Sequence, residues 1–242
     1  MSILTRTSAI TDQVRLFRVL KFGEGEGDVD RATGMRTYVF SGTTLAEVEQ
    51  AKYLGITLSD KLDWEAQVDN ITKKASNTLN FLKRNLKYCP KQCKEVAYFA
   101  LVRSTVEYCS VVWDPHTFKE KDKVERVNRR AARMVSNDYG RHSSVTSMLT
   151  QLGWATLEQR RENQRLTMMY KVVHGLVAVP TTHLTAADSR TRANHRNKFR
   201  TISCNSTPYK YSFFPRTIPS WNLLPAETVE ATSVDAFKHR LP

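Results

Sequence analysis

The chain has 242 residues, 40% of them hydrophobic, which is enough to bury a core in one large domain or two small ones. Lys and Arg outnumber Asp and Glu by 37 to 24, and the formal charge of +13 predicts a polyanionic partner, with RNA or DNA first. The four cysteines are too few for a disulfide framework and no apolar run reaches the ~20 residues of a bilayer span, so we expect a nuclear or cytoplasmic protein with no membrane partner.

Residues 1–36 match no recognisable element and stay unassigned. Their glycine- and acid-rich part, 21–34, predicts a flexible linker. Asp28 and Asp30 would suit the start of a calcium loop. However, Ala32 and Thr33 stand where that loop needs a further oxygen ligand and a glycine, so the linker interpretation is preferred.

The next segment, 37–60, predicts a β-hairpin. Tyr38–Phe40 precede the turn signal Ser41–Gly42, and Ile56–Leu58 are strand-forming residues. An isolated hairpin is marginally stable in water, so we expect these two strands to pair and to pack on a helix or border a sheet that the chain lacks. In the latter case an uncovered apolar patch would favour self-association.

The clearest helix begins near Trp64 and ends near Leu86, with Asp63 as its expected N-cap. Apolar residues recur along it at steps of three and four, and they form one stripe. Five cations occupy its other faces: Lys73, Lys74, Lys83, Arg84 and Lys87. No acid occurs between Asp69 and Glu95. Such a surface can contact the phosphates of a nucleic acid, although the plain alternative is a solvated helix face.

Further helices follow along the chain. Residues 91–112 are apolar nearly all round and predict a buried helix that ends at 113–116, "WDPH". A helix over 118–136 sets an apolar stripe against a second basic zone: Arg126, Arg129, Arg130 and Arg133. Shorter patterns predict helices over 143–151, 156–175 and 233–241, with Gly175 as a stop signal.

A third basic zone lies in an acid-free stretch, 189–226. We take four of its arginines as candidate phosphate contacts: Arg190, Arg192, Arg196 and Arg200. Aromatic residues are interleaved with these cations, and unpaired bases stack on such rings. For Phe213, Phe214 and Trp221 we favour burial in a core instead.

The sequence offers no catalytic or metal-binding set. Cys89 and Cys93 have the spacing of half a zinc site, but no second close pair accompanies them. The acids from Asp60 to Asp69 could serve a two-metal enzyme, but acids near a helix start are favoured by the helix dipole in any case. We therefore predict no catalytic residue, no metal and no cofactor.

Several motifs nevertheless recur in a specific order: "AKYLGITLSDKLDWEAQVDNITKKA", "YFALVRSTVEYCSVVWDP", "KVERVNRRAARMV", "LGWATLEQRRENQRLTMMYKVVHGLV", "ADSRTRANH" and "SFFPRTIPSWNLLP". From about Tyr38 to the C-terminus the chain resembles the C-terminal part of reverse transcriptases from non-LTR retrotransposons, the LINE-like elements of the jockey and CR1 kind. Tyr53, Leu54 and Gly55 match the YLG positions of that family. Trp64 and Trp113 match its two characteristic tryptophans.

The resemblance implies a mainly α fold. Residues 37–60 would be a β-hairpin remnant of the palm edge, 61–116 thumb-like helices, and 117–242 a basic, loop-rich helical region. It also implies a fragment of an RNA-directed DNA polymerase that binds RNA, DNA or an RNA–DNA hybrid. The chain has no Asp-Asp pair, so the Mg²⁺ chemistry of an intact polymerase is not expected here. The alternative is a non-catalytic protein-interaction module derived from such an element.

Overall fold

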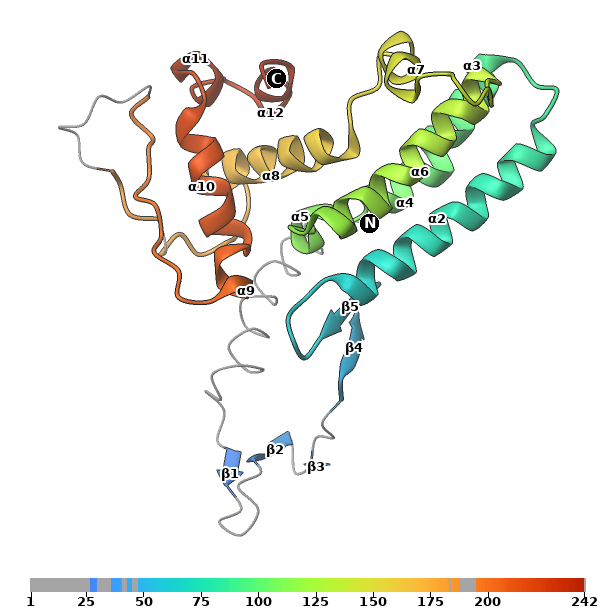
Figure 1. Cartoon of the computed structure of the whole chain (residues 1–242). Coiled ribbons are helices and arrows are strands. Elements are labelled where there is room, and N and C mark those ends of the chain that lie inside the picture. Colours follow the sequence, from blue (N-terminus) through green and yellow to red (C-terminus); the bar gives the residue numbers. More distant parts are fainter. Residues whose placement is uncertain are drawn as a thin grey trace.

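The computed structural model describes residues 27–29, 36–40, 43–44, 48–182, 184–187 and 195–241. The chain is mainly helical, with two small antiparallel sheets before the first described helix (Figure 1). One sheet contains β1 (Gly27–Val29), β2 (Arg36–Phe40) and β3 (Thr43–Thr44), in that order. The other is a hairpin of β4 (Gln50–Tyr53) and β5 (Ile56–Ser59).

The predicted pairing of the strands was wrong. The strand at 36–40 pairs with β1 and β3, whereas β5 pairs with β4. Leu54 and Gly55 cause this difference because both adopt positive φ, of 45° and 85°. Two such residues form the tight turn that connects hairpin strands, so Tyr53 faces Ile56 directly. The YLG segment is therefore a strand end and its turn.

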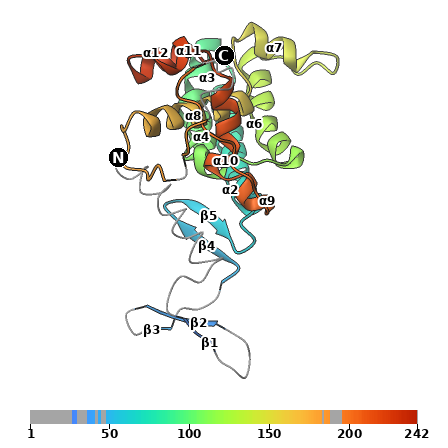
Figure 2. The ribbon, with the colours of Figure 1, turned by 90° about the vertical axis from the view of Figure 1, so that its left-hand side faces the viewer.

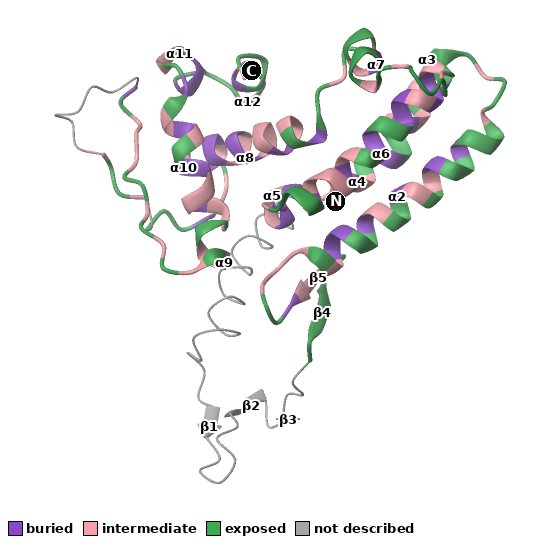
Figure 3. Cartoon of the chain, in the orientation of Figure 1, coloured by how far each residue is buried: buried purple, intermediate pink, exposed green. Residues whose placement is uncertain are grey.

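The hairpin packs on the first described helix, α2 (Glu65–Asn85). Packing on a helix was one of the two expectations for these strands. The backbone N–H of Thr57 donates to Gln67 Oε1 at 2.8 Å, and Asn70 Nδ2 donates to Thr57 Oγ1 at 3.1 Å. Ile56 is buried in the helical core, while β4 is exposed along its length (Figure 3). Figure 2 shows the hairpin at one end of the helical body.

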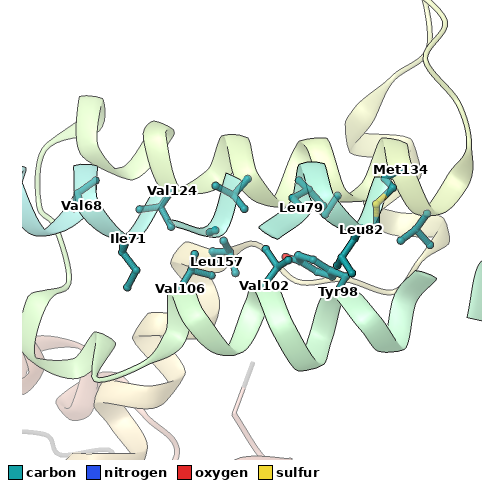
Figure 4. Packing of buried hydrophobic residues seen from close by; sticks show 14 of the residues in the cluster. Val68, Ile71, Leu79, Leu82, Tyr98, Val102, Val106, Val124, Met134 and Leu157 are labelled. Carbon is teal, nitrogen blue, oxygen red and sulfur yellow. The ribbon is translucent and has the colours of Figure 1, made fainter. Parts of the chain in front are cut away.

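Three helical segments pack side by side in the first part of the body: α2, α6 (Phe118–Ser136) and the run α3–η1–α4. That run comprises α3 (Lys91–Ala97), the π-helix η1 (Tyr98–Arg103) and α4 (Ser104–Glu107). Their apolar stripes meet in one core cluster (Figure 4). Tyr98 is fully buried there, donates to Asn128 Oδ1 at 2.8 Å and stacks on Trp154.

The prediction of one buried helix over 91–112 was wrong. A π-helical turn interrupts it, and Cys109, with φ 50°, separates α4 from α5 (Ser110–Trp113). Val96 and Leu101 are 66% and 50% exposed, because only one side of the run faces the core. The expected stop at "WDPH" is confirmed, since α5 ends at Trp113.

The helices described after α6 are α7 (Val145–Gln151), α8 (Leu157–Val173), α9 (Thr207–Lys210), α10 (Phe213–Leu223), α11 (Ala226–Val229) and α12 (Val234–His239). Residues of α8, α10, α11 and α12 form a second core cluster, whereas α7 packs on α6 and α9 contacts α10. Helix α8 contacts both α6 and α10 and so connects the two clusters (Figure 1). Phe214 and Trp221 are buried, as expected of core residues, and Phe213 is half-buried.

Helix ends follow local capping rules. Thr117, Ser144, Thr156 and Ser233 accept from backbone N–H groups at the starts of α6, α7, α8 and α12. At the start of α2 the N-cap residue is Trp64, which makes no side-chain cap bond, but Asp63 Oδ1 accepts from the backbone N–H of Glu65 at 3.4 Å, so the expected acceptor lies one residue before the N-cap. In the described part of the chain, no helix has the length and the apolar character that a bilayer crossing needs.

Candidate nucleic-acid interface

Five cations follow the exposed side of α2 and the residues just beyond it; we call this set the outer face of α2. It consists of Lys73, Lys74, Lys83, Arg84 and Lys87. All five are exposed, and the opposite side of the helix is buried in the first core cluster. Lys73 and Arg84 are eleven residues apart, so their positions lie about 16 Å apart along the helix axis.

The outer face carries charge that no acid offsets nearby. Within the described ranges, none of its five cations forms an ion pair with a carboxylate. The two acids of α2 that do form ion pairs, Glu65 and Asp69, lie in its first turns and contact α6. Lys119 Nζ lies 2.8 Å from Glu65 Oε1, and Lys123 Nζ lies 2.5 Å from Asp69 Oδ1.

Those ion pairs account for part of the acid cluster that was considered as a two-metal site. Hydrogen bonding from Lys119 lowers the pKa of the Glu65 carboxyl, so this group is held in its charged form. Across the described segments, no three His, Cys, Asp or Glu side chains gather in a group that could hold a metal ion. The calcium-loop alternative involved Asp28 and Asp30. Asp30 lies outside the described residues, and for Asp28 the structure describes only its strand pairing.

The four arginines of α6 differ in their hydrogen-bond partners. Arg126 Nε and Arg129 Nη1 donate to Asp122 at 2.8 and 3.0 Å, and these bonds lower the pKa of Asp122. Arg130 reaches α2 instead, where it donates to Ser76 Oγ and Asn80 Oδ1. Arg130 is exposed and both of these partners are neutral, so its charge adds to the outer face of α2.

Arg133 has a structural role. Its guanidinium donates to the backbone oxygens of Gly140 and Ser143, which holds the loop after α6. The C-terminal candidates are partly described: Arg196 and Arg200 are exposed in the segment before α9. Arg190 and Arg192 lie outside the described residues.

Two exposed aromatic rings lie beside the outer face of α2, and sequence reasoning missed both. Tyr88 is 90% exposed, and Lys87 Nζ lies 5.2 Å from its ring centroid. Tyr139 is 49% exposed, and Lys83 Nζ lies 4.2 Å from its centroid. Tyr88 follows a lysine directly and could have been noticed, but the contact of Tyr139 with Lys83 depends on the tertiary structure.

The two tryptophans and the YLG segment singled out from the sequence occupy structural positions. Trp113 is fully buried and donates from Nε1 to Tyr108 O at 2.8 Å. Trp64 is half-buried against the first core cluster. Tyr108 in turn donates from its hydroxyl to Leu54 O at 3.1 Å, which fastens the hairpin turn to the helical body. These residues therefore support the hairpin and the first core cluster.

In comparisons with known proteins, no family model, no curated protein and no solved structure matches the chain.

Proposed function

We propose that this chain is a fragment of an RNA-directed DNA polymerase of a mobile element, in which a thumb-like helical bundle binds the template–primer duplex. The ordered motifs that resemble non-LTR reverse transcriptases support this origin. The observation that carries the binding role is the outer face of α2, five exposed cations without a paired carboxylate in the described structure.

The chemistry of this face suits a phosphate backbone. Lysine and arginine side chains contact phosphates irrespective of base, and a helix about 30 Å long passes several phosphates of a duplex. Arg130 widens the charged surface toward α6, and Tyr88 and Tyr139 offer rings on which an unpaired base can stack. We therefore expect binding that weakens steeply with salt and varies little with sequence.

The decisive experiment measures RNA–DNA hybrid binding across a salt series. We change Lys73, Lys83, Arg84 and Lys87 together to Ala, which lowers the formal charge from +13 to +9. The affinity should fall, and the slope of log affinity against log salt should flatten by about three to four units. The fold should persist, since all four side chains are exposed.

A matched control removes the same charge from cations that are already paired. Lys119, Lys121, Arg126 and Arg129 each contact a carboxylate, and their change to Ala also leaves a charge of +9. This control should retain most of the affinity. If instead the outer-face variant binds unchanged and neutralising Arg190, Arg192, Arg196 and Arg200 abolishes binding, the interface lies in the C-terminal zone.

The second candidate function is a protein-interaction module, and the exposed side chains of Val96 and Leu101 on the α3–η1 surface favour it. Apolar contacts of this kind depend weakly on salt. A chain that shows no salt-dependent binding to hybrid, duplex or single strand would support this module and contradict the polymerase-fragment proposal.

A further inference from the structure

Three arginines converge on a single buried carboxylate between the two core clusters, at Asp114. Arg161 Nε donates to Asp114 Oδ1 at 2.8 Å. Arg165 Nε and Arg216 Nη2 lie 3.2 and 3.0 Å from Oδ2. Arg216 Nη1 also donates to Asp114 O at 2.6 Å. We call these four residues the arginine cluster; it connects the end of α5 with α8 and α10.

The cluster carries more positive than negative charge. Asp114 supplies one negative charge against three guanidinium groups. Among the described residues, two further carboxylates act on these guanidinium groups without contacting them. Glu162, which accepts from Ser220 Oγ, acts on Arg165. Glu158, which pairs with Lys121 at 2.6 Å in a more exposed position, acts on Arg161 and Arg216. Burial and the charge of Arg216 lower the pKa of the Arg165 guanidinium, which reflects the crowding of like charges.

The arginine cluster also contains buried N–H donors that have no acceptor among the described residues. The side chain of Arg161 is 1% exposed, yet its Nη1 and Nη2 have no hydrogen-bond acceptor among the described residues. The same holds for Arg165 Nη1, on a side chain that is 8% exposed. A buried donor without an acceptor is costly, and a buried charge without a partner is costlier. Water could accept these hydrogen bonds, but an anion would accept them and also add negative charge beside the three guanidinium groups.

We propose that the arginine cluster is a binding site for a small inorganic oxyanion of the phosphate type. The planar fork of a guanidinium matches two oxygens of such an ion, and Arg161 and Arg165 supply the donors. The burial of both side chains suits a small free ion and excludes a polymer backbone, so this site is separate from the outer face of α2. The bound ion would stabilise the junction of α5, α8 and α10.

The test is thermal unfolding of the full chain with inorganic phosphate, at ionic strength held constant with sodium chloride. Phosphate that binds only the folded state lowers the unfolding constant by the factor 1 + [phosphate]/Kd. We expect phosphate to bind at a saturable site. At phosphate concentrations above Kd, the unfolding constant should then fall about tenfold for each tenfold rise in the phosphate concentration. An unfolding constant that does not respond to millimolar phosphate would overturn the proposal.

Two variants separate this site from general salt effects. Arg161→Gln should abolish the phosphate dependence, whereas Lys171→Gln removes a charge from the same helix outside the cluster and should retain it. Equal dependence in both variants would refute the site. If Arg161→Gln does not fold, a ³¹P titration of the unaltered chain should show one bound phosphate per chain, and its absence would refute the site as well.

A last experiment uses a 5′-phosphorylated dinucleotide in place of phosphate. Because Arg161 is enclosed, the dinucleotide should stabilise the unaltered chain no more than it stabilises the Arg161→Gln variant. Stabilisation that requires Arg161 would show that the cluster accepts a nucleotide phosphate and would overturn the assignment to a free ion.

Discussion

Leu54 holds a backbone conformation that a side chain such as leucine rarely adopts. Its φ of 45° lies in the left-handed region, which costs a non-glycine residue about 1 kcal/mol or more. Asn tolerates this region, and Asn-Gly is the preferred pair of a two-residue hairpin turn. The strain at Leu54 is compatible with the fold because Tyr108 and Gly55 determine the turn around it.

Leu54→Asn should therefore stabilise the chain by about 1 kcal/mol in urea unfolding. Little apolar burial is lost, since Leu54 is 45% exposed. Leu101→Asn serves as the control, because Leu101 is similarly exposed but lies in a helical segment. If the two substitutions change the free energy of unfolding alike, backbone strain at Leu54 is not the cause.

His195 couples stability to pH. Its Nε2 lies 3.1 Å from Trp221 O, and its Nδ1 is buried with no hydrogen-bond partner in the described part of the chain. Burial lowers the pKa of His195 from its ordinary value of about 6.5. The unfolded chain therefore binds more protons than the folded chain as the pH falls below about 6.5.

It follows that this contribution is present above about pH 6.5 and is lost as the solution becomes more acidic. The free energy of unfolding should fall between about pH 7 and pH 5.5, and it should fall less in His195→Gln. The exposed His142 provides the control His142→Gln. A pH dependence that is the same in all three chains would contradict the role of His195.

At the scale of elements, Asp114 connects three helices through one carboxylate. Asp114→Asn keeps the shape of the side chain but removes the charged carboxylate that the buried Arg161 and Arg165 and the half-buried Arg216 contact. Removing one partner of a buried ion pair costs about 3–5 kcal/mol. We expect a loss of this size in urea unfolding, measured in buffer without phosphate.

Asp122 is a matched control for this prediction, since it also contacts two arginines but on the surface of α6. Surface ion pairs contribute at most about 1 kcal/mol, so Asp122→Asn should have a small effect. Similar losses in both variants would show that the arginine cluster depends on packing more than on the Asp114 charge.

At the scale of the whole molecule, the proposed function predicts binding without synthesis. Phosphoryl transfer requires metal ions held by close carboxylates, and the sequence has no adjacent aspartates. Purified chain with primer, template and Mg²⁺ should extend no primer, whereas an intact polymerase in the same buffer should. Template-dependent extension that exceeds a mock preparation would contradict the assignment as a binding fragment.

The sequence by itself determined several of the helices, but it did not predict α9, α10 and α11, which lie in the region expected to be rich in loops. The helix predicted over 118–136 has the same bounds as α6, and the predicted positions of α2, α8 and α12 agree closely with the structure. Apolar periodicity, Thr and Ser caps and the stop at Gly175 are properties of neighbouring residues, so one short window contains all the information. The predictions of the strand pairing and of one long helix over 91–112 were wrong because positive-φ residues and a π-helical turn change the backbone direction at these places.

Only the tertiary structure decided which cations are available to a ligand. Lys123 and Lys83 have the same charge in the sequence, but Lys123 pairs with Asp69 of another helix whereas Lys83 lies over the ring of Tyr139. The arginine cluster joins residue 114 to residues 161, 165 and 216, which no motif relates. Electrostatic and hydrogen-bond energies depend on distances between atoms, and for segments a hundred residues apart those distances are fixed by packing of the helices.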